Sequence, residues 1–267
     1  MTKTETPGTL LTEMRGTAPL VQCITNYVAM NVAANVLLAA GASPAMVHAE
    51  EEAGEFAGFA GALTINIGTL SSAWVAGMKA AIGSAVAARR PWVLDPVAHF
   101  ATGFRRKTAA DLLALGPAIV RGNASEIIAL AGSVSSAKGV DSRDPVEEAE
   151  DAARRLAGTQ RCIVAVTGVT DFVTDGRRTA RIEGGSPLMP KVTALGCSLT
   201  CLVGAYAAIR PDEPFDATVA ALAHFSVAGE QAGKEAKGPG SFSVRFLDLL
   251  AEIDGAMLDN RARVARL

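Results

Sequence analysis

The feature of this sequence that most restricts its fold is the alternation of short apolar runs with longer segments rich in small residues. Runs such as 19–25 (PLVQCIT), 92–95 (WVLD) and 162–167 (CIVAVT) have the length of strands. They lack the polar alternation of a half-exposed strand, as is typical of parallel strands covered on both faces. The sequence therefore predicts a three-layer α/β/α fold with a mainly parallel central sheet. No repeat or long linker divides residues 1–267, which we expect to form a single domain.

Cap and turn signals predict the other elements. The remaining predicted strands are 45–48, 63–67 and 118–121, followed by a hairpin of 171–174 and 177–182 around Asp175-Gly176. The predicted helices are 27–40 (capped by Asn26), 50–59, a helix to Ala88 capped by Ser71 or Ser72, 103–115, 124–131, a helix from Asp144-Pro145 to Ala157, 197–209, 217–231 and 242–258. The polar segment 133–144 predicts a loop.

Composition excludes several function classes. Hydrophobic residues make up 49% of the chain and charged residues 19%, yet no run reaches the ~18 apolar residues of a membrane span. The first residues lack the basic and apolar regions of a signal peptide, so we expect a cytoplasmic protein. A net charge of −2 with no basic block argues against nucleic-acid binding. Some of the apolar surface could lie between subunits.

The four cysteines show neither a CxxC motif nor a Cys/His cluster typical of zinc sites. Cys23, Cys162 and Cys201 fall within apolar segments and are expected to be plain core residues. Cys197 lies near the start of a predicted helix, where the helix dipole lowers a thiol pKa. Two interpretations of Cys197 remain open: a reactive thiol, or a small apolar residue packed in the core.

Polar and small residues gather where predicted strands end, and in open α/β sheets ligands bind beyond that edge. Asp95 can hold Mg²⁺ there, although Asp-Pro is also a common turn opener. Arg121 can bind a phosphate through paired donors. Glu126 can order metal-bound water, or complete a capping box with Asn123.

The segment 192–197 (VTALGC) places small residues before a helix start, which is typical of an anion site. The chain has no GxxxxGK[ST] motif, which excludes a P-loop enzyme. It also has no GxGxxG after the first strand, which argues against a dinucleotide-binding Rossmann protein.

Together, these segments resemble the hydroxyethylthiazole kinase family of the ribokinase-like superfamily. The matching stretches are QCITNYVAMNVAANVLLAAGASPAM (22–46), INIGTL (65–70), VLDPV (93–97), IVRGNASEI (119–127), VAVTGVTDFVTDG (164–176) and VTALGCSLT (192–200). The resemblance implies that ATP phosphorylates the hydroxyl of 4-methyl-5-(2-hydroxyethyl)thiazole, a salvage step toward thiamine. It also implies Mg²⁺ and a homotrimer with active sites between subunits.

The resemblance assigns roles residue by residue. ATP-binding positions are Arg121, Thr167, Gly168 and Gly196. Substrate-binding positions are Asn26, Met46 and Ala194. The acids near Mg²⁺ are Asp95 and Glu126, and Cys197 takes the place of the catalytic aspartate of most ribokinase-like kinases.

One departure concerns the last motif, in which many members have Thr-Gly-Thr-Gly-Cys where this chain has TALGC (193–197). Ala194 replaces a glycine that contacts substrate, and we expect alanine to serve if its φ is negative. Leu195 adds bulk near the anion site.

The implied mechanism holds the γ-phosphate over the N–H groups of Gly196, Cys197 and Ser198, with Cys197 as a base or as a group that orients the hydroxyl. Three alternatives stay open: a ribokinase-like kinase acting on the pyrimidine precursor of thiamine or on a sugar, an ATP-dependent dehydratase that repairs hydrated nicotinamide cofactors, and a non-catalytic thiazole- or nucleotide-binding protein. The dehydratases carry an aspartate in a GxGD-type loop, and Cys197 argues against that assignment.

Overall fold

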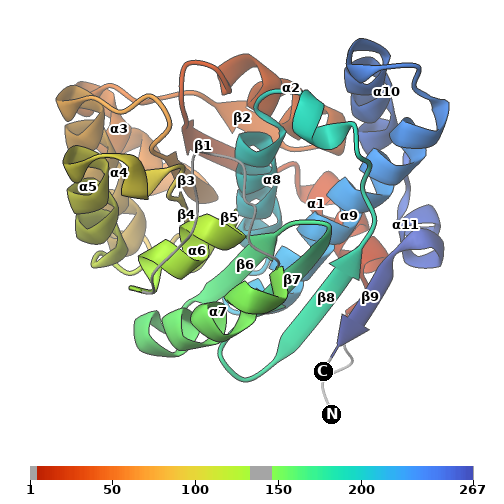
Figure 1. Cartoon of the computed structure of the whole chain (residues 1–267). Helices are drawn as coiled ribbons and strands as arrows, with labels where there is room; N and C mark the ends of the chain where they lie inside the picture. The colour runs from red at the N-terminus through yellow and green to blue at the C-terminus, as the bar shows by residue number, and fades with distance from the viewer. Residues whose placement is uncertain (1–4, 133–145, 267) are drawn as a thin grey trace.

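The computed structural model describes residues 5–132 and 146–266, which form a nine-stranded sheet between two layers of helices (Figure 1). The strands are β1 Leu20–Ile24, β2 Ser43–Ala45, β3 Ala62–Asn66, β4 Trp92–Asp95, β5 Ile119–Asn123, β6 Ile163–Thr167, β7 Thr170–Thr174, β8 Thr179–Glu183 and β9 Arg263–Arg266. The α-helices are α1 Pro7–Thr17, α2 Met30–Ala40, α3 Glu50–Phe59, α4 Ser72–Ala87, α5 Gly103–Leu113, α6 Ala124–Leu130, α7 Val146–Gln160, α8 Leu195–Ile209, α9 Pro214–Glu235, α10 Pro239–Glu252 and α11 Gly255–Arg261.

The order of strands in the sheet is β2-β1-β3-β4-β5-β6-β7-β8-β9. The strands from β2 to β6 are parallel, and β7, β8 and β9 extend the sheet in antiparallel pairing. The register pairs Asn66 with Asp95 and Asn123 with Thr167. The carboxyl ends of the parallel strands therefore meet along one edge of the sheet, where ligands bind in such folds.

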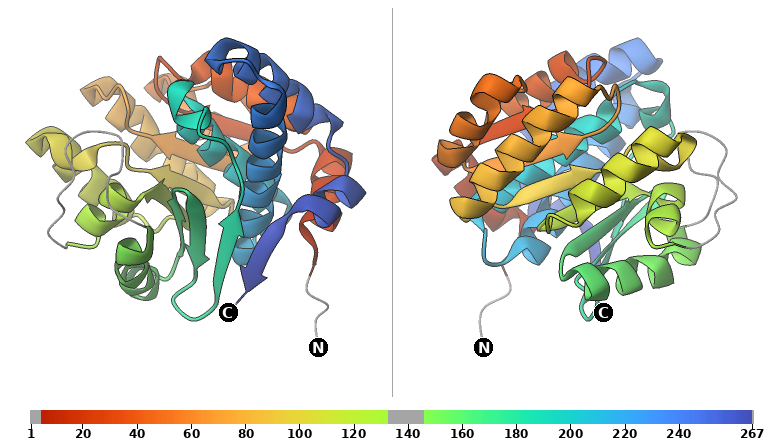
Figure 2. Two further views of the ribbon diagram at one scale, coloured as in Figure 1. Left: turned by 45° about the vertical axis from the view of Figure 1, so that its right-hand side comes forward. Right: turned by 90° about the vertical axis from the view of Figure 1, so that its left-hand side faces the viewer.

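Two hydrophobic clusters lie on opposite faces of the sheet. One joins α1, α2 and α8 to α11, and the other joins α3 to α7. The two rotated views show these two groups of helices on opposite sides of the sheet (Figure 2). Neighbouring strand residues alternate between the clusters, with Ile163 and Ala165 in the first and Val164 and Val166 in the second. This two-sided burial explains why the strands are apolar throughout.

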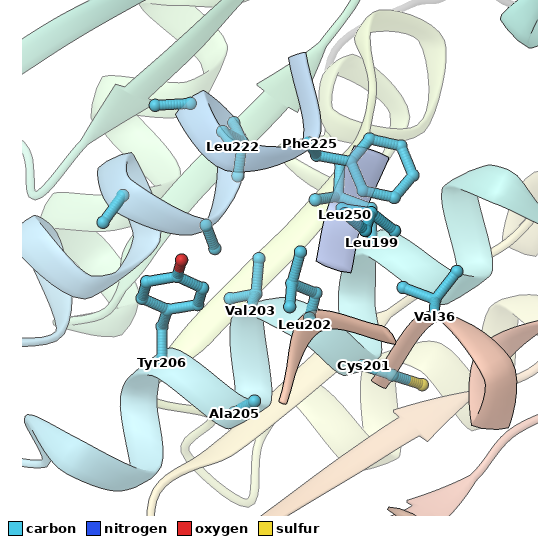
Figure 3. Packing of buried hydrophobic residues seen from close by; sticks show 14 of the residues in the cluster. Val36, Leu199, Cys201, Leu202, Val203, Ala205, Tyr206, Leu222, Phe225 and Leu250 are labelled. Carbon is cyan, nitrogen blue, oxygen red and sulfur yellow. The ribbon is translucent and has the colours of Figure 1, made fainter. Parts of the chain in front are cut away.

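Helix α8 is the centre of the first cluster and carries the glycine and cysteine of the last motif. Leu199, Val203 and Tyr206 on α8 pack toward Leu222 and Phe225 on α9 (Figure 3). All five side chains are at most 5% exposed. This packing fixes the position of the α8 N-terminus relative to the sheet.

The predicted three-layer architecture and the hairpin of β7 and β8 are confirmed. The strand predicted at 45–48 is wrong, because β2 covers Ser43–Ala45. The predicted helix 27–40 begins only at Met30, since the Asn26 side chain accepts hydrogen bonds from the N–H groups of Val28 and Ala29 in a preceding turn. The predicted loop 133–144 and the helix start at Asp144 lie outside the described residues.

The α-helices and strands without a predicted counterpart lie near the termini, and two short 3₁₀ helices, His99–Ala101 and Met189–Lys191, were also not predicted. Thr6 caps α1 and Pro7 stands at its first position, a start signal that was present in the sequence. Asp254 caps a separate helix, so the predicted helix 242–258 is two helices, α10 and α11. Strand β9 is largely exposed and has no apolar run to predict it. Among residues 5–132 and 146–266, no helix has the length and apolar character needed to span a membrane.

Candidate active site

A continuous set of hydrogen bonds runs along the carboxyl edge of the sheet, starting from Asn26 after β1 and Asn66 at the end of β3. Asn26 Nδ2 donates to Asn66 Oδ1 at 2.8 Å and to Cys197 Sγ at 3.3 Å. Asn66 Nδ2 in turn donates to Asp95 Oδ2 at 2.8 Å, and Thr200 Oγ1 donates to the same oxygen at 2.8 Å. The thiol of α8 is thereby connected to the carboxylate at the end of β4.

Arg121 continues this set toward β6. Its Nη2 donates to Thr167 Oγ1 at 2.6 Å, and its Nη1 lies 3.7 Å from Asp95 Oδ2. The residue is only 9% exposed, and its Nε has no hydrogen-bond partner among the described residues. A buried guanidinium with unused donors can bind an anion.

A cavity of about 600 Å³ opens beside Arg121. The predicted ATP positions Arg121, Thr167, Gly168 and Gly196 all line it. Its other described walls come from the turn after β6, the loop after β8, the start of α8, and α9. The structure thus brings the four predicted nucleotide-binding residues into one cavity of the size of a small-molecule site.

The N-terminus of α8 points its unpaired N–H groups at this region, since the first residues of a helix have no intrahelical acceptor. A Cβ on Gly196 would lie 3.0 Å from Arg121 Nη1, so glycine permits the close approach of helix and guanidinium. The helix begins at Leu195, two residues earlier than predicted. Ser198 N–H donates to the carbonyl of Ala194, so the predicted use of that group for phosphate is wrong.

Ala194 has a φ of +66°, so the negative φ that was the condition for alanine to serve in place of glycine is not met. It stands immediately before the first helical residue, in the left-handed region that favours glycine. The backbone of the last motif therefore keeps the conformation suited to glycine, although this chain carries alanine there.

Of the two interpretations left open for Cys197, the structure does not support a pKa lowered by the helix N-terminus, because the pKa is raised to about 11. Burial is the largest cause, and the negative charge of Asp95 adds to it, whereas the hydrogen bond from Asn26 opposes both. The group is therefore a neutral thiol near pH 7. Cys23, Cys162 and Cys201 are buried, as predicted for core residues.

Asp95 and Glu126 are both buried and lie close enough to influence each other. The pKa of Glu126 is raised to about 7, first by burial and then by the charge of Asp95. Burial also raises the pKa of Asp95, against the charge of Arg121. Glu126 accepts hydrogen bonds from the N–H groups of Ala98 and Asn123, which confirms the capping box.

One buried carboxylate oxygen without a hydrogen-bond partner among the described residues supports the fit of this acid pair to Mg²⁺. Asp95 Oδ1 is buried without a hydrogen-bond partner in the described part of the chain. Residues 5–132 and 146–266 contain no group of three or more His, Cys, Asp or Glu side chains able to hold a metal. Mg²⁺ commonly takes one or two carboxylates and fills its remaining positions with phosphate oxygens and water. The residues fit that kind of site.

The predicted substrate positions are more dispersed. Asn26 contacts Cys197, and Ala194 precedes the same helix. Met46 follows β2 at the same edge of the sheet and packs against the first hydrophobic cluster. None of Asn26, Met46 and Cys197 is among the described residues that line the cavity.

Four polar residues of the site were missed: Asn66, Asp171, Thr200 and Ser226. Asn66 and Asp171 fell within predicted strands, and Thr200 and Ser226 within predicted helices, where polar residues carry no ligand signal by themselves. Asn66 and Thr200 both reach Asp95. The position of Asn66 at the end of β3, equivalent to Asp95 at the end of β4, was the available signal.

Residues 11–255 match the model of the hydroxyethylthiazole kinase family. The chain belongs to that family. It is 71% identical over 264 residues to a hydroxyethylthiazole kinase of Rhizobium rhizogenes, covering 99% of this chain and 98% of the relative. It is 65% identical over 257 residues to one of Cereibacter sphaeroides, covering 96% and 97%.

Solved structures agree with this assignment. A hydroxyethylthiazole kinase of Pyrococcus horikoshii OT3 superposes with a TM-score of 0.90 at 41% identity, covering 98% of each chain. The pyridoxal kinase of Staphylococcus aureus superposes with a TM-score of 0.65 at 15% identity, covering 93% of this chain and 97% of that one. At that identity the likeness concerns the fold, and it confirms the predicted ribokinase-like architecture of this hydroxyethylthiazole kinase family member.

Proposed function

We propose that this chain transfers the γ-phosphoryl group of ATP to the hydroxyl of 4-methyl-5-(2-hydroxyethyl)thiazole, a salvage step toward thiamine. The observation that carries the proposal is the Arg121 cavity, because it holds every predicted ATP position and adjoins the hydrogen bonds that lead to Cys197. Membership of the hydroxyethylthiazole kinase family supplies the acceptor. The whole chain acts as one kinase domain in the cytoplasm.

The phosphate chemistry follows from the local charges. Arg121 pairs with Thr167 and faces the start of α8, so the guanidinium and the N–H groups of Leu195, Gly196 and Cys197 converge on the place for the γ-phosphate. The transition state of phosphoryl transfer is loose, and positioning with charge stabilisation supplies most of the rate. These donors are fixed by burial and packing before substrate arrives.

Asp95 and Glu126 are the residues that would hold Mg²⁺, which would neutralise charge on the phosphates when bound. The orphaned Oδ1 of Asp95 is the available ligand atom. Glu126 is held by two backbone N–H groups, a placement suited to ordering water. Arg121 balances the charge of Asp95 at 3.7 Å.

Cys197 orients the acceptor hydroxyl in this proposal and does not serve as a strong base. With a pKa raised to about 11, its thiolate is scarce near pH 7. Asn26 donates to the sulfur, which leaves the S–H free to turn toward a hydroxyl. A loose transition state requires little removal of the hydroxyl proton before transfer.

We also propose that the acceptor site is completed by neighbouring subunits in a homotrimer. Tyr27 and Val28, directly after Asn26, are 69% and 57% exposed. Apolar side chains of this size beside a site are typical of an interface. Light scattering should give the mass of three chains, and a monomer at micromolar concentration would contradict this part of the proposal.

The experiment that tests the activity uses radiolabelled ATP and a panel of alcohols: the thiazole alcohol, the pyrimidine precursor of thiamine, pyridoxal and ribose. We expect phosphate transfer to the thiazole alcohol, lost with EDTA and restored with Mg²⁺. Transfer to another member of the panel in preference to the thiazole would overturn the assigned acceptor. Absence of transfer to all of them would overturn the kinase assignment.

A further inference from the structure

Asp171 is a buried carboxylate beside the cavity that none of the steps above uses. It is the second residue of β7 and is 9% exposed. Phe172 belongs to the cluster of α3 to α7 and Val173 to the opposite cluster. The alternation of a strand therefore turns Asp171 toward α8 and α9, and it lines the cavity with Arg121 and Gly168.

Asp171 lies where three walls of the cavity meet. Its Oδ1 accepts from the N–H of Gly168 at 2.9 Å, in the turn after β6. The hydroxyl of Ser226 on α9 lies beside the same carboxylate and favours its charged form, which lowers its pKa. The carbonyl of Ser226 accepts from the N–H of Gly185 at 3.0 Å, in the loop after β8.

The turn held in this way includes Thr167, the hydrogen-bond partner of Arg121. Val169 in the same turn is 93% exposed and contributes almost no packing. Without the bond from Gly168 N–H to Asp171, little else on the cavity side fixes the turn. Thr167 itself is held by its pairing with β5 and by hydrogen bonds to Arg121 and to the carbonyl of Gly122. Loss of the Gly168 bond would therefore leave Gly168 and Val169 free to adopt several positions before a nucleotide binds.

We propose that Asp171 is a positioning residue for nucleotide binding, which fixes Gly168 in the turn after β6 through the hydrogen bond that it accepts from Gly168 N–H, with the Ser226 hydroxyl of α9 beside the same carboxylate. The inference rests on the proposed kinase function, because it assumes that the cavity takes the phosphates of ATP. Its action is geometric: Asp171 holds a protein group that lines the cavity.

The test compares Asp171→Ala with Asp171→Asn, since asparagine keeps an oxygen acceptor for Gly168 N–H and an amide for Ser226. ADP affinity is measured by calorimetric titration, and kcat and both KM values by phosphate transfer. We expect Asp171→Ala to weaken ADP binding and raise the ATP KM about tenfold, the effect of one lost hydrogen bond to a charged group. The KM of the acceptor should change less than twofold or so, and Asp171→Asn should recover ADP affinity to within about threefold.

Glu150→Ala is the matched control, because Glu150 is a nearly buried carboxylate paired with Arg181 and is not a lining residue of the cavity. It should lower stability without changing ADP affinity. If Asp171→Ala does not fold, Ser226→Ala takes its place and should weaken ADP binding in the same direction. Unchanged ADP affinity in the folded variant, or equal losses in Asp171→Ala and Asp171→Asn, would overturn the inference.

The two readouts separate this inference from the proposed function. If the chain binds ADP but transfers no phosphate to the thiazole alcohol, the proposed acceptor is overturned. The role of Asp171 is then still tested by the ADP affinities of its variants. Normal phosphate transfer with unchanged ADP affinity in Asp171→Ala overturns only the role of Asp171.

Discussion

Asn26 donates a hydrogen bond to the sulfur of Cys197 at 3.3 Å, across 171 positions of sequence. The same amide nitrogen donates to Asn66, which donates to Asp95. The thiol of Cys197 and the carboxylate of Asp95 are therefore joined by one set of side-chain hydrogen bonds. Each member is at the end of a strand or at the start of α8, so the sheet itself sets the distances between them.

Removing the Asn26 amide should lower turnover. In Asn26→Ala the thiol loses its donor and the buried Asn66 oxygen loses a partner, which we expect to reduce kcat about tenfold and to cost about 1–3 kcal/mol of unfolding free energy. Steady-state kinetics and urea denaturation measure both. Asn35→Ala is the control, because among the described residues its amide bonds only to Asn31, on the exposed face of α2. A wild-type kcat in folded Asn26→Ala would show that this contact does not matter to transfer.

Replacing the thiol tests its part in transfer directly. Cys197→Ala should lower kcat about 100-fold while the ATP KM changes little, because the thiol acts on the acceptor and Arg121 and the helix start hold the nucleotide. Initial rates over a range of ATP and acceptor concentrations give the separate constants. Cys162→Ala, at a buried thiol on the opposite face, serves as the control. Wild-type kcat in Cys197→Ala would refute its role.

The left-handed backbone at Ala194 predicts a stabilising substitution. Ala194→Gly should raise the free energy of unfolding by about 1 kcal/mol, since alanine is strained at a φ of +66°. Ala110→Gly, at an exposed position within α5, should have the opposite sign and lower it by about 1 kcal/mol. Urea denaturation of the natural chain, Ala194→Gly and Ala110→Gly measures these free energies of unfolding. Destabilisation of equal size at both positions would mean that Ala194 is not strained.

Asp171 predicts a pH-dependent difference in stability. Burial raises its pKa from 3.8 to about 6, so the folded chain binds this proton more tightly than the unfolded chain. The stability that this provides is present below about pH 4 and is lost as the pH rises through about 6. Asp171→Asn has no such loss. The difference between its free energy of unfolding and that of the natural chain should therefore grow in its favour from pH 4 to pH 7, to at most about 3 kcal/mol.

Urea denaturation of both proteins at several pH values measures this difference, and the other titrating groups cancel because both chains carry them. A difference that stays constant from pH 4 to pH 8 would contradict a raised pKa of Asp171. The sign also distinguishes this carboxylate from a surface acid, whose pKa is lowered by ion pairs, as for Asp175 beside Arg178.

Local patterns in the chain determined most of the architecture. Apolar runs of strand length, caps such as Ser71 and the Asp175-Gly176 turn depend on residues close in sequence, so the sheet and most helices could be predicted. The ends of the parallel strands then indicated Asp95, Arg121 and Thr167, because parallel topology places those ends together. The edge strands β2 and β9 were the exceptions, since short or exposed strands carry little apolar signal.

Tertiary structure alone decided how those residues behave. The pKa of Cys197 rises because burial and Asp95 outweigh the helix N-terminus, and both come from distant parts of the chain. The positive φ of Ala194 and the roles of Asn66 and Asp171 depend likewise on contacts made by strands and helices after they pack. The sequence determined which chemical groups reach the edge of the sheet, whereas packing set their solvation and neighbours, and hence their charge and orientation.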